Sequence, residues 1–329
     1  MSGPTFPPAP QPCPAARPKR RHDDPAELHV ICVYSNPVRY RSRRRLHEQH
    51  QRRLAEAGVT AWVVEATFGE RPAEVADPAN PRHIAVRCDS EVWLKEAMIN
   101  IAAAAIPADA KYLMWQDGDI EFLRPDWAAE TIEALQHYAV VQPFSHAVDL
   151  GPDGEAIEHH FGFAYEYARG TRPGQPGARF MHPGFCWAWR RKAWDEVGGM
   201  IDRAICGAGD HHMALGLIGL AEQSLPGGVH PNYRAMVMDW QRLAGMKVRR
   251  DIGHVPGTIL HHFHGWKADR RYQGRWAIVV DNQYDPEADV TRDSAGMLRL
   301  RPERTKLRDE LRAYFRQRME DGGRKSWPV

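Results

Sequence analysis

The stretch Lys111-Tyr-Leu-Met-Trp115-Gln-Asp117-Gly118-Asp119-Ile-Glu-Phe122 decides how this chain is interpreted. Residues 111–115 form an apolar run of strand length. Because alternate residues of an extended backbone point to the same side, the carboxylates of Asp117 and Asp119 are expected to converge. Gly118 between them would let a phosphate or ribose approach the backbone. Paired carboxylates suit Mg²⁺ or Mn²⁺. Asp-Gly is also a common turn, but its place after a strand favours the functional interpretation.

The segments on either side of this stretch alternate between strands and helices. Strands are predicted at 29–34, 60–65, 83–88, 111–115 and 138–143. Helices are predicted at 91–105 and 127–137, and a strongly basic one around 39–53. This order predicts an α/β fold with a largely parallel sheet, flanked by helices, that binds ligands at the carboxyl ends of its strands.

Composition sets outer limits on the class of protein. The 329 residues are 43% hydrophobic and 26% charged, which excludes collagenous, coiled-coil and wholly disordered chains. A net charge of +2 is too small to indicate nucleic-acid binding by bulk charge. No apolar stretch is long enough to cross a bilayer and no secretory signal begins the chain. Five cysteines without a CxxC pair argue against a cysteine-rich zinc site. A cytoplasmic enzyme is the expectation.

Four regions are predicted along the chain. Residues 1–27 form a disordered tail rich in proline and arginine. Residues 28–285 form the main domain, with a ligand-binding half at 28–150 and a mixed second half at 151–285. Residues 286–329 are expected to form a helical C-terminal extension.

A histidine-rich segment, His261-His262-Phe263-His264-Gly265-Trp266, follows an apolar run near the end of the main domain. Extended alternation would place His262 and His264 on one face, where imidazoles can bind a divalent metal. His261 is expected to fill the core or cap a loop. Four nearby side chains could hold phosphate oxygens: Arg270, Arg271, Tyr272 and Arg275.

A third segment, Gly207-Ala-Gly209-Asp210, precedes residues with helical character. Asp210 would stand at the helix start, where its plain role is to cap the helix. Its sharper role is that of a general base which removes a proton from an attacking hydroxyl. Spacing alone does not separate these roles.

Together these segments resemble the GT-A fold glycosyltransferases over about residues 28–281. The resemblance rests on the strand ending at Ser35-Asn36-Pro37, the Asp117-Gly118-Asp119 "DXD" element, the 187–194 segment before Gly198-Gly199, Asp210 and His264. The later elements are similar to galactosyltransferases and polypeptide N-acetylgalactosaminyltransferases. The Trp93-Leu-Lys95-Glu96 helix and His264-Gly265 look like glycosyltransferase-like proteins of bacteria and their phages, which implies a bacterial or phage-infected host cell. One departure is that Asp210 is followed by histidines instead of acids.

The resemblance implies a role for each matching residue. Asp119, Asp117 and His264 would hold Mn²⁺ or Mg²⁺, with Asp117 contacting ribose or metal-bound water. Lys95 and Arg271 would hold the diphosphate of a nucleoside-diphosphate sugar, with a uridine donor expected. Asp210 would be the base of an inverting transfer to an acceptor hydroxyl on a glycan, a protein or a modified phage DNA base. The nucleobase and ribose would lie against Ser35, Asn36, Arg39 and Glu65.

Three other functions use similar residues. A nucleotidyltransferase usually carries a glycine-rich basic loop after its first strand, where this chain has Ser35-Asn36-Pro37. A metallohydrolase could use Asp117, Asp119 and four histidines around two metals: His211, His212, His262 and His264. A non-catalytic carbohydrate- or nucleic-acid-binding protein would need neither a metal nor a base.

Overall fold

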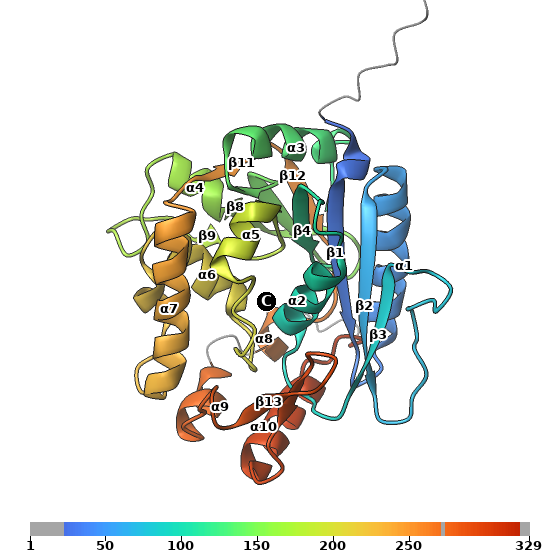
Figure 1. Ribbon diagram of the computed structural model, residues 1–329, viewed down its shortest axis with the longest axis vertical. Coiled ribbons are helices and arrows are strands. Elements are labelled where there is room, and N and C mark those ends of the chain that lie inside the picture. The colour runs from blue at the N-terminus through green and yellow to red at the C-terminus, as the bar shows by residue number, and fades with distance from the viewer. Residues whose placement is uncertain (1–22, 271–273, 323–329) are drawn as a thin grey trace, which may run out of the picture.

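Sheet A, a seven-stranded sheet, forms the centre of the computed structural model, which describes residues 23–270 and 274–322 (Figure 1). Its strand order is β11-β6-β10-β4-β1-β2-β3. Only β10 runs antiparallel to its neighbours. The α/β prediction with a mostly parallel sheet is therefore confirmed. The strands are β1 (Leu28–Ser35), β2 (Thr60–Phe68), β3 (His83–Cys88), β4 (Tyr112–Gln116), β6 (Val140–Gln142), β10 (Cys186–Arg190) and β11 (Ile252–His254).

Helices cover both faces of sheet A because its central strands are apolar on both sides. In β1, Ile31 packs into the same core as Met98 of α2, whereas Val30 packs into the opposite core with Leu54 of α1. The first face carries α2 (Lys95–Ala105), α5 (Arg191–Val197), α6 (Gly209–Leu217) and α7 (Pro231–Lys247); the other carries α1 (Arg41–Glu56) and α3 (Trp127–His137). The predicted helix at 91–105 begins four residues late, because the Trp93 amide donates to the Ile205 carbonyl instead.

Sheet B, a second sheet of five strands, continues directly from the first. Its order is β5-β12-β7-β8-β9, with β5 (Ile120–Phe122), β7 (His146–Leu150), β8 (Ala156–Gly162), β9 (Met181–His182) and β12 (Thr258–His261). Four times the chain passes between sheets A and B through three residues: 117–119, 143–145, 183–185 and 255–257. These crossings bond to one another, as the Asp117 amide donates to the Phe185 carbonyl at 2.8 Å. The predicted functional residues of the DXD element thus lie where the two sheets meet.

Shorter elements complete the chain. They are η1 (Pro25–Glu27), α4 (Phe163–Ala168), η2 (Ala221–Ser224), α8 (Lys267–Arg270) and α9 (Trp276–Asp281). Order begins before the predicted boundary at residue 28, because the Asp24 carboxylate caps η1 and the Thr60 hydroxyl bonds the Ala26 carbonyl. Residues 1–22 of the predicted tail lie outside the described residues. None of the helices that the structure describes has the length and apolar character needed to cross a membrane.

The C-terminal extension, for which a helix was predicted, contains a hairpin as well as a helix. It starts with a hairpin of β13 (Val290–Arg292) and β14 (Leu298–Leu300), followed by α10 (Thr305–Gln317). The Asp293 carboxylate accepts the amides of Ala295 and Met297, which closes the turn. Met297 and Leu298 are fully buried in the core shared with α2. The extension is therefore part of the main body (Figure 1).

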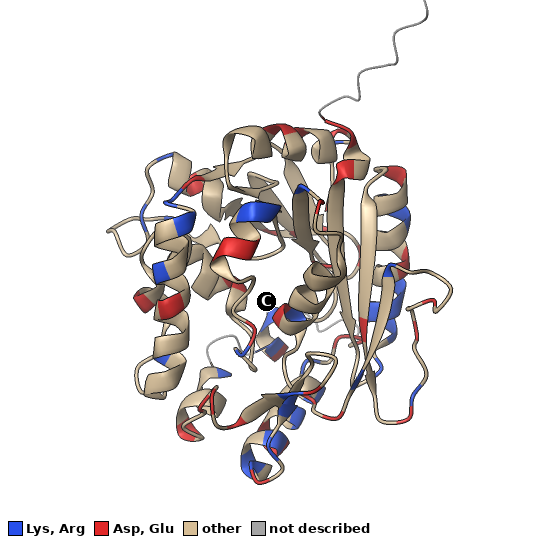
Figure 2. Ribbon diagram, viewed as in Figure 1, with Lys and Arg blue, Asp and Glu red and all other residues tan. Residues whose placement is uncertain are grey.

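After α10, two acidic residues fasten the chain to the start of α1. Both α1 and α10 are rich in basic residues (Figure 2). Glu320 is 2% exposed and pairs with Arg43 at 2.5 Å and Arg318 at 2.8 Å. Burial alone would raise the pKa of Glu320, but these two guanidinium groups hold it well below its usual range. The Asp321 carboxylate accepts hydrogen bonds from the backbone amides of Arg41 and Ser42, which lie in the first turn of α1 and have no partner within the helix.

We expect the two acidic residues to differ in their contribution to stability. Glu320→Ala leaves two arginines without their shared buried carboxylate and should cost about 3–5 kcal/mol. Asp321→Ala, the matched control, removes only a helix cap and should cost about 1 kcal/mol. Denaturant unfolding of both variants measures the difference. Equal, small losses would show that the buried ion cluster does not hold this segment.

Candidate functional site

A carboxylate and two imidazoles converge at the junction of the two sheets. The Nε2 atom of His264 lies 2.9 Å from Oδ2 of Asp119 and 3.1 Å from Nε2 of His261, and the latter lies 3.7 Å from Oδ1 of Asp119. The pairing predicted from alternation, His262 with His264, is wrong. Strand β12 ends at His261, so the chain turns and residues three apart meet instead. His262 faces Glu121 and Arg53 on α1.

The protonation of this cluster suits metal binding. Burial would raise the pKa of Asp119, but the neighbouring His264 and His261 hold it well below its usual range. Burial first, then the nearby Arg270 guanidinium, lowers the pKa of His264 to about 4, so its imidazole is neutral. Burial opposes the charge of His261, but Asp119 and a hydrogen bond to Asp149 outweigh it and raise its pKa to about 9. A divalent cation would displace the proton from His261.

Two observations test whether a metal fits here. The ligand atoms of Asp119, His261 and His264 all lie within 4.8 Å of one another. Oδ1 of Asp119 is buried and has no hydrogen-bond partner among the described residues, which is costly unless something else pairs with it. One carboxylate and two imidazoles match a first-row divalent ion such as Mn²⁺. The residues present therefore fit a metal, and the set includes His261, which sequence reasoning assigned to the core.

The other acid of the DXD element has a different partner. Asp117 lies 2.5 Å from Nζ of Lys95, which stands 4.3 Å above the Trp115 ring. Burial raises the pKa of Asp117 to about 6, although Lys95 opposes this shift. A Cβ added at Gly118 would meet nothing within 4 Å, so open space lies beside this glycine. The predicted Lys95 is thus brought into the site, while Asp117 orients that lysine and does not join the imidazoles.

Asp210 lies on α6, next to the crossing that carries Gly184. It lies in the first turn of α6, and its Oδ1 accepts the His211 amide at 2.8 Å. The N-cap itself is Ala208, so the capping role predicted for Asp210 is wrong in position. A Cβ added at Gly184 would come within 2.8 Å of the Asp210 carboxylate, so only glycine fits there without a shift. Asp210 therefore lies against the crossing at 183–185.

Two residues with strained backbone angles lie near these side chains. Ala208 and Phe185 have φ angles of 76° and 75°, in the left-handed region that disfavours residues with a Cβ. Ala208 precedes Asp210 by two residues, and the Phe185 carbonyl binds the Asp117 amide. Strain of this kind costs about 1–3 kcal/mol per residue and clusters at functional sites.

The predicted nucleoside-binding residues lie at and just after the end of β1, except Glu65, which lies within β2. Asn36 is buried and its amide group bonds the Tyr34 hydroxyl and both backbone groups of Tyr40. Glu65 accepts three backbone amides, those of Glu74, Val75 and Ala76. Arg39 is largely exposed and has a φ of 67°. Asn36 and Glu65 therefore shape the loops around Ser35, and their contact with a nucleoside stays a prediction. Arg271 lies outside the described residues.

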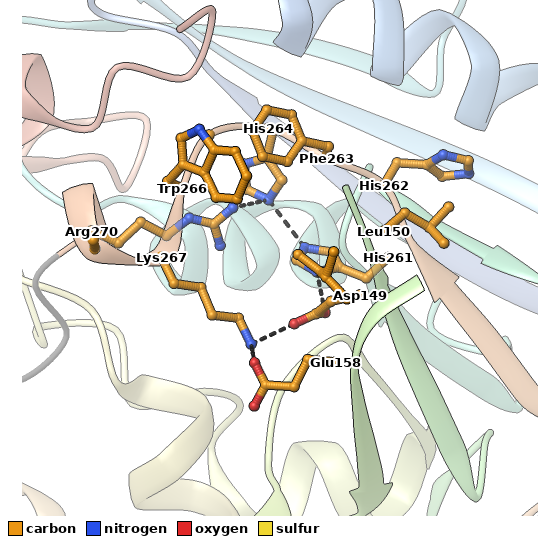
Figure 3. A pocket seen from close by; sticks show the side chains of 13 residues that line it. Asp149, Leu150, Glu158, His261, His262, Phe263, His264, Trp266, Lys267 and Arg270 are labelled. Carbon is orange, nitrogen blue, oxygen red and sulfur yellow. Dashed lines mark hydrogen bonds and ion pairs between the residues drawn. The ribbon is translucent and has the colours of Figure 1, made fainter. Parts of the chain in front are cut away.

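A row of charged side chains beside the metal cluster was missed from the sequence. Asp149 of β7 contacts His261, His160 and Lys267. Asp149, His261 and Lys267 border a cavity of about 350 Å³ that is also lined by His264, Trp266 and Arg270 (Figure 3). No local signal marks Asp149, because its partners come from other strands.

The histidines of the two-metal alternative are not gathered in one place. His212 is fully buried and bonds the hydroxyls of Ser224 and Tyr233. Within the described residues, neither His211 nor His212 belongs to a group with metal-ligand spacing. Trp187, Trp189 and Trp194 are also core residues.

Comparisons with known proteins give weak structural similarity. No family model matches the chain, and no curated protein matches its sequence. The chain is similar to the catalytic domain of Drosophila β1,4-galactosyltransferase 7 bound to xylobiose, at 11% identity and a TM-score of 0.38, covering 85% of this chain and 97% of that one. A mutant of that Drosophila protein in complex with manganese, UDP-Gal and xylobiose is similar at 12% identity and a TM-score of 0.36, with the same coverage of both chains. A Mycobacterium tuberculosis protein in complex with manganese is similar at 12% identity and a TM-score of 0.33, covering 77% of this chain and 97% of that one. TM-scores this low do not allow the function of these proteins to be assigned to this chain.

Glu96 beside the site should make stability depend on pH. It is 2% exposed, and burial raises its pKa to about 8, with Lys95 opposing the shift and Asp210 adding to it. The stability contributed by the protonated carboxyl is complete below the unfolded pKa near 4.5 and is lost as pH rises through 8. Glu96→Gln should therefore be increasingly more stable than the native protein above pH 4.5, by up to about 1.4 kcal/mol per pH unit.

Urea unfolding at pH 5 and pH 8.5 tests this expectation. The exposed Glu133 on α3 provides the control variant, Glu133→Gln, whose difference from the native protein should not change with pH. A constant difference for Glu96→Gln at both pH values would contradict the buried, protonated carboxyl.

Proposed function

We propose that this chain is a metal-dependent glycosyltransferase that moves a sugar from a nucleoside-diphosphate sugar to an acceptor hydroxyl. The observation that carries the proposal is the convergence of an ionised Asp119, a neutral His264, the ammonium of Lys95 and the carboxylate of Asp210 on one junction between sheets. A transferase of this kind must hold an anionic leaving group and deprotonate an incoming hydroxyl in the same place.

Asp119, His261 and His264 would hold the metal, with Mn²⁺ favoured over Mg²⁺ by the two imidazoles. When bound, the ion supplies Lewis-acid stabilisation of the charge that develops on the departing diphosphate. The orphaned oxygen of Asp119 is the support for this assignment.

The cations of the chain act on the same leaving group. Lys95 is held by Asp117 at 2.5 Å, and although burial disfavours its charge, the acidic groups of Asp117, Asp210 and Glu96 raise its pKa. It therefore stays charged and can neutralise a phosphate oxygen. Arg270, whose NH2 group lies 2.7 Å from Nε2 of His264, adds a second positive charge near the site. We propose that Arg271 also holds the diphosphate. Ser35, Asn36, Arg39 and Glu65 would border the uridine of the donor.

Asp210 would act as the general base. Its Oδ1 is occupied by the His211 amide, which fixes the side chain, and Oδ2 faces Gly184. A carboxylate fixed in this way can accept the proton of an acceptor hydroxyl as the hydroxyl attacks the anomeric carbon. Attack from the side opposite the leaving diphosphate would invert that carbon.

The metal requirement is tested with a panel of nucleotide sugars and Mn²⁺. Asp119→Ala should abolish donor binding, measured by calorimetry, because the carboxylate ligand of the metal is lost. Glu121→Gln is the matched control, since that carboxylate faces Arg53 and His262 instead. Full activity in EDTA would refute the proposal. Release of sugar without any acceptor dependence would favour a metallohydrolase, and transfer of a nucleotidyl group would favour a nucleotidyltransferase.

The base is tested by Asp210→Asn. Donor binding should be preserved, because Asp210 does not contact the metal cluster, while transfer should slow by about 10²–10⁴-fold. Single-turnover kinetics with bound donor separates the two effects. Transfer at nearly the native rate would mean that Asp210 is not the base and would favour a retaining mechanism.

A further inference from the structure

Three side chains of sheet B form a row on the face that borders the metal cluster. The strand register places His261 of β12 beside Asp149 of β7, and Asp149 beside Glu158 of β8. Partners in register project to the same face of a sheet. A register shift between Asp149 and Leu150 interrupts the β7–β8 ladder at this point, a feature that re-aims side chains near functional sites.

The two oxygens of Asp149 have different partners. Oδ2 receives Lys267 Nζ at 2.5 Å and His160 Nε2 at 2.9 Å. Oδ1 lies 2.7 Å from Nδ1 of His261 and has no other partner among the described residues. Figure 3 shows Lys267 between Asp149 and Glu158, with Asp149 linked onward to His261. One oxygen is thus neutralised by a lysine, and the other is reserved for the imidazole.

This arrangement fixes which nitrogen of His261 is available. A carboxylate can only accept a hydrogen bond, so the proton of that bond is on Nδ1 of His261. Nε2 is then the nitrogen directed at Asp119 and His264. Without Asp149, the ring could rotate or carry its proton on Nε2, and either change would remove a metal ligand.

The charge of Asp149 is compensated within the row. Asp149 is 3% exposed, and a buried carboxylate is costly unless it is paired. Lys267 Nζ contacts both Asp149 and Glu158 at 2.5 Å and lies 3.1 Å from Nε2 of His160. Asp149, Glu158 and His160 have metal-ligand spacing of their own, but the lysine ammonium already supplies the positive charge there.

We propose that Asp149 is a positioning residue for the metal site, which holds His261 so that its Nε2 completes the set formed by Asp119 and His264. The inference rests on the metal site of the proposed function. Lys267 and His160 hold Asp149 in place behind the three ligands. A carboxylate behind a ligating histidine typically changes metal affinity by about 10–100-fold.

The test measures Mn²⁺ binding by the protein alone, from the electron paramagnetic resonance signal of free Mn²⁺. Asp149→Ala removes the acceptor and should weaken binding about 10–100-fold. Asp149→Asn keeps an oxygen that can accept the Nδ1 proton and should restore most of the affinity. Glu158→Gln is the matched control, because Glu158 contacts Lys267 and does not contact His261. It should bind Mn²⁺ as the native protein does.

Each outcome decides the proposal. Native affinity in Asp149→Ala, or an equal loss in Glu158→Gln, would overturn the positioning role while leaving the metal site standing. A native protein that binds no Mn²⁺ would overturn the metal site and this inference with it. If Asp149→Ala does not fold, nitrogen-15 spectra of the native imidazoles decide, recorded above pH 9 where His261 carries a single proton, with His261 assigned from His261→Gln. A proton on Nδ1 of His261 supports the role, and its absence there overturns it.

Discussion

The rest of the structure depends on how the chain crosses between its two sheets. Each of the four crossings has three residues, too few to form a loop with a conformation of its own. The strands on both sides therefore fix where the crossing residues lie, and the crossings bond to one another through Asp117 and Phe185, and through Ser145 and Gly257. Polar side chains at such positions are held by the rigid sheets on either side of them, which is what a site needs for fixed geometry.

This constraint explains which features the sequence could predict. The strands 29–34, 60–65, 83–88 and 111–115 match β1 to β4 closely, because each is a local apolar run. Asp119 and Asp210 were predicted because a strand end or an expected helix start marks their position, whereas Lys95 was predicted from the family resemblance alone. His261 and Asp149 could not be found in this way. They are partners because β7 and β12 pair in register across 112 residues, and a pattern read along the chain contains no information about which strands become neighbours.

The site concentrates energetic costs that other parts of the fold must offset. Buried carboxylates, buried imidazoles and two strained residues meet within one junction, and each is unfavourable on its own. They are tolerated because these charges have neighbours of opposite sign: Lys95 for Asp117, Lys267 for Asp149, and the protonated His261 for Asp119. Oδ1 of Asp119 is nevertheless buried without a hydrogen bond among the described residues. A buried acceptor of this kind marks a place where a further positive charge would fit.

The attachment of the C-terminal segment to α1 also bears on how the protein is made. Glu320 and Asp321 bind residues that precede them by 277 to 280 positions. During synthesis the early strands and α1 leave the ribosome long before these acids exist, so the first amides of α1 lack their Asp321 partner and Arg43 lacks its Glu320 partner until then. Closing so long a loop costs little more entropy than closing a moderate one, and the delay is thus set by translation. A nascent chain can fold sheet A early, but it gains this final attachment only when residue 321 emerges.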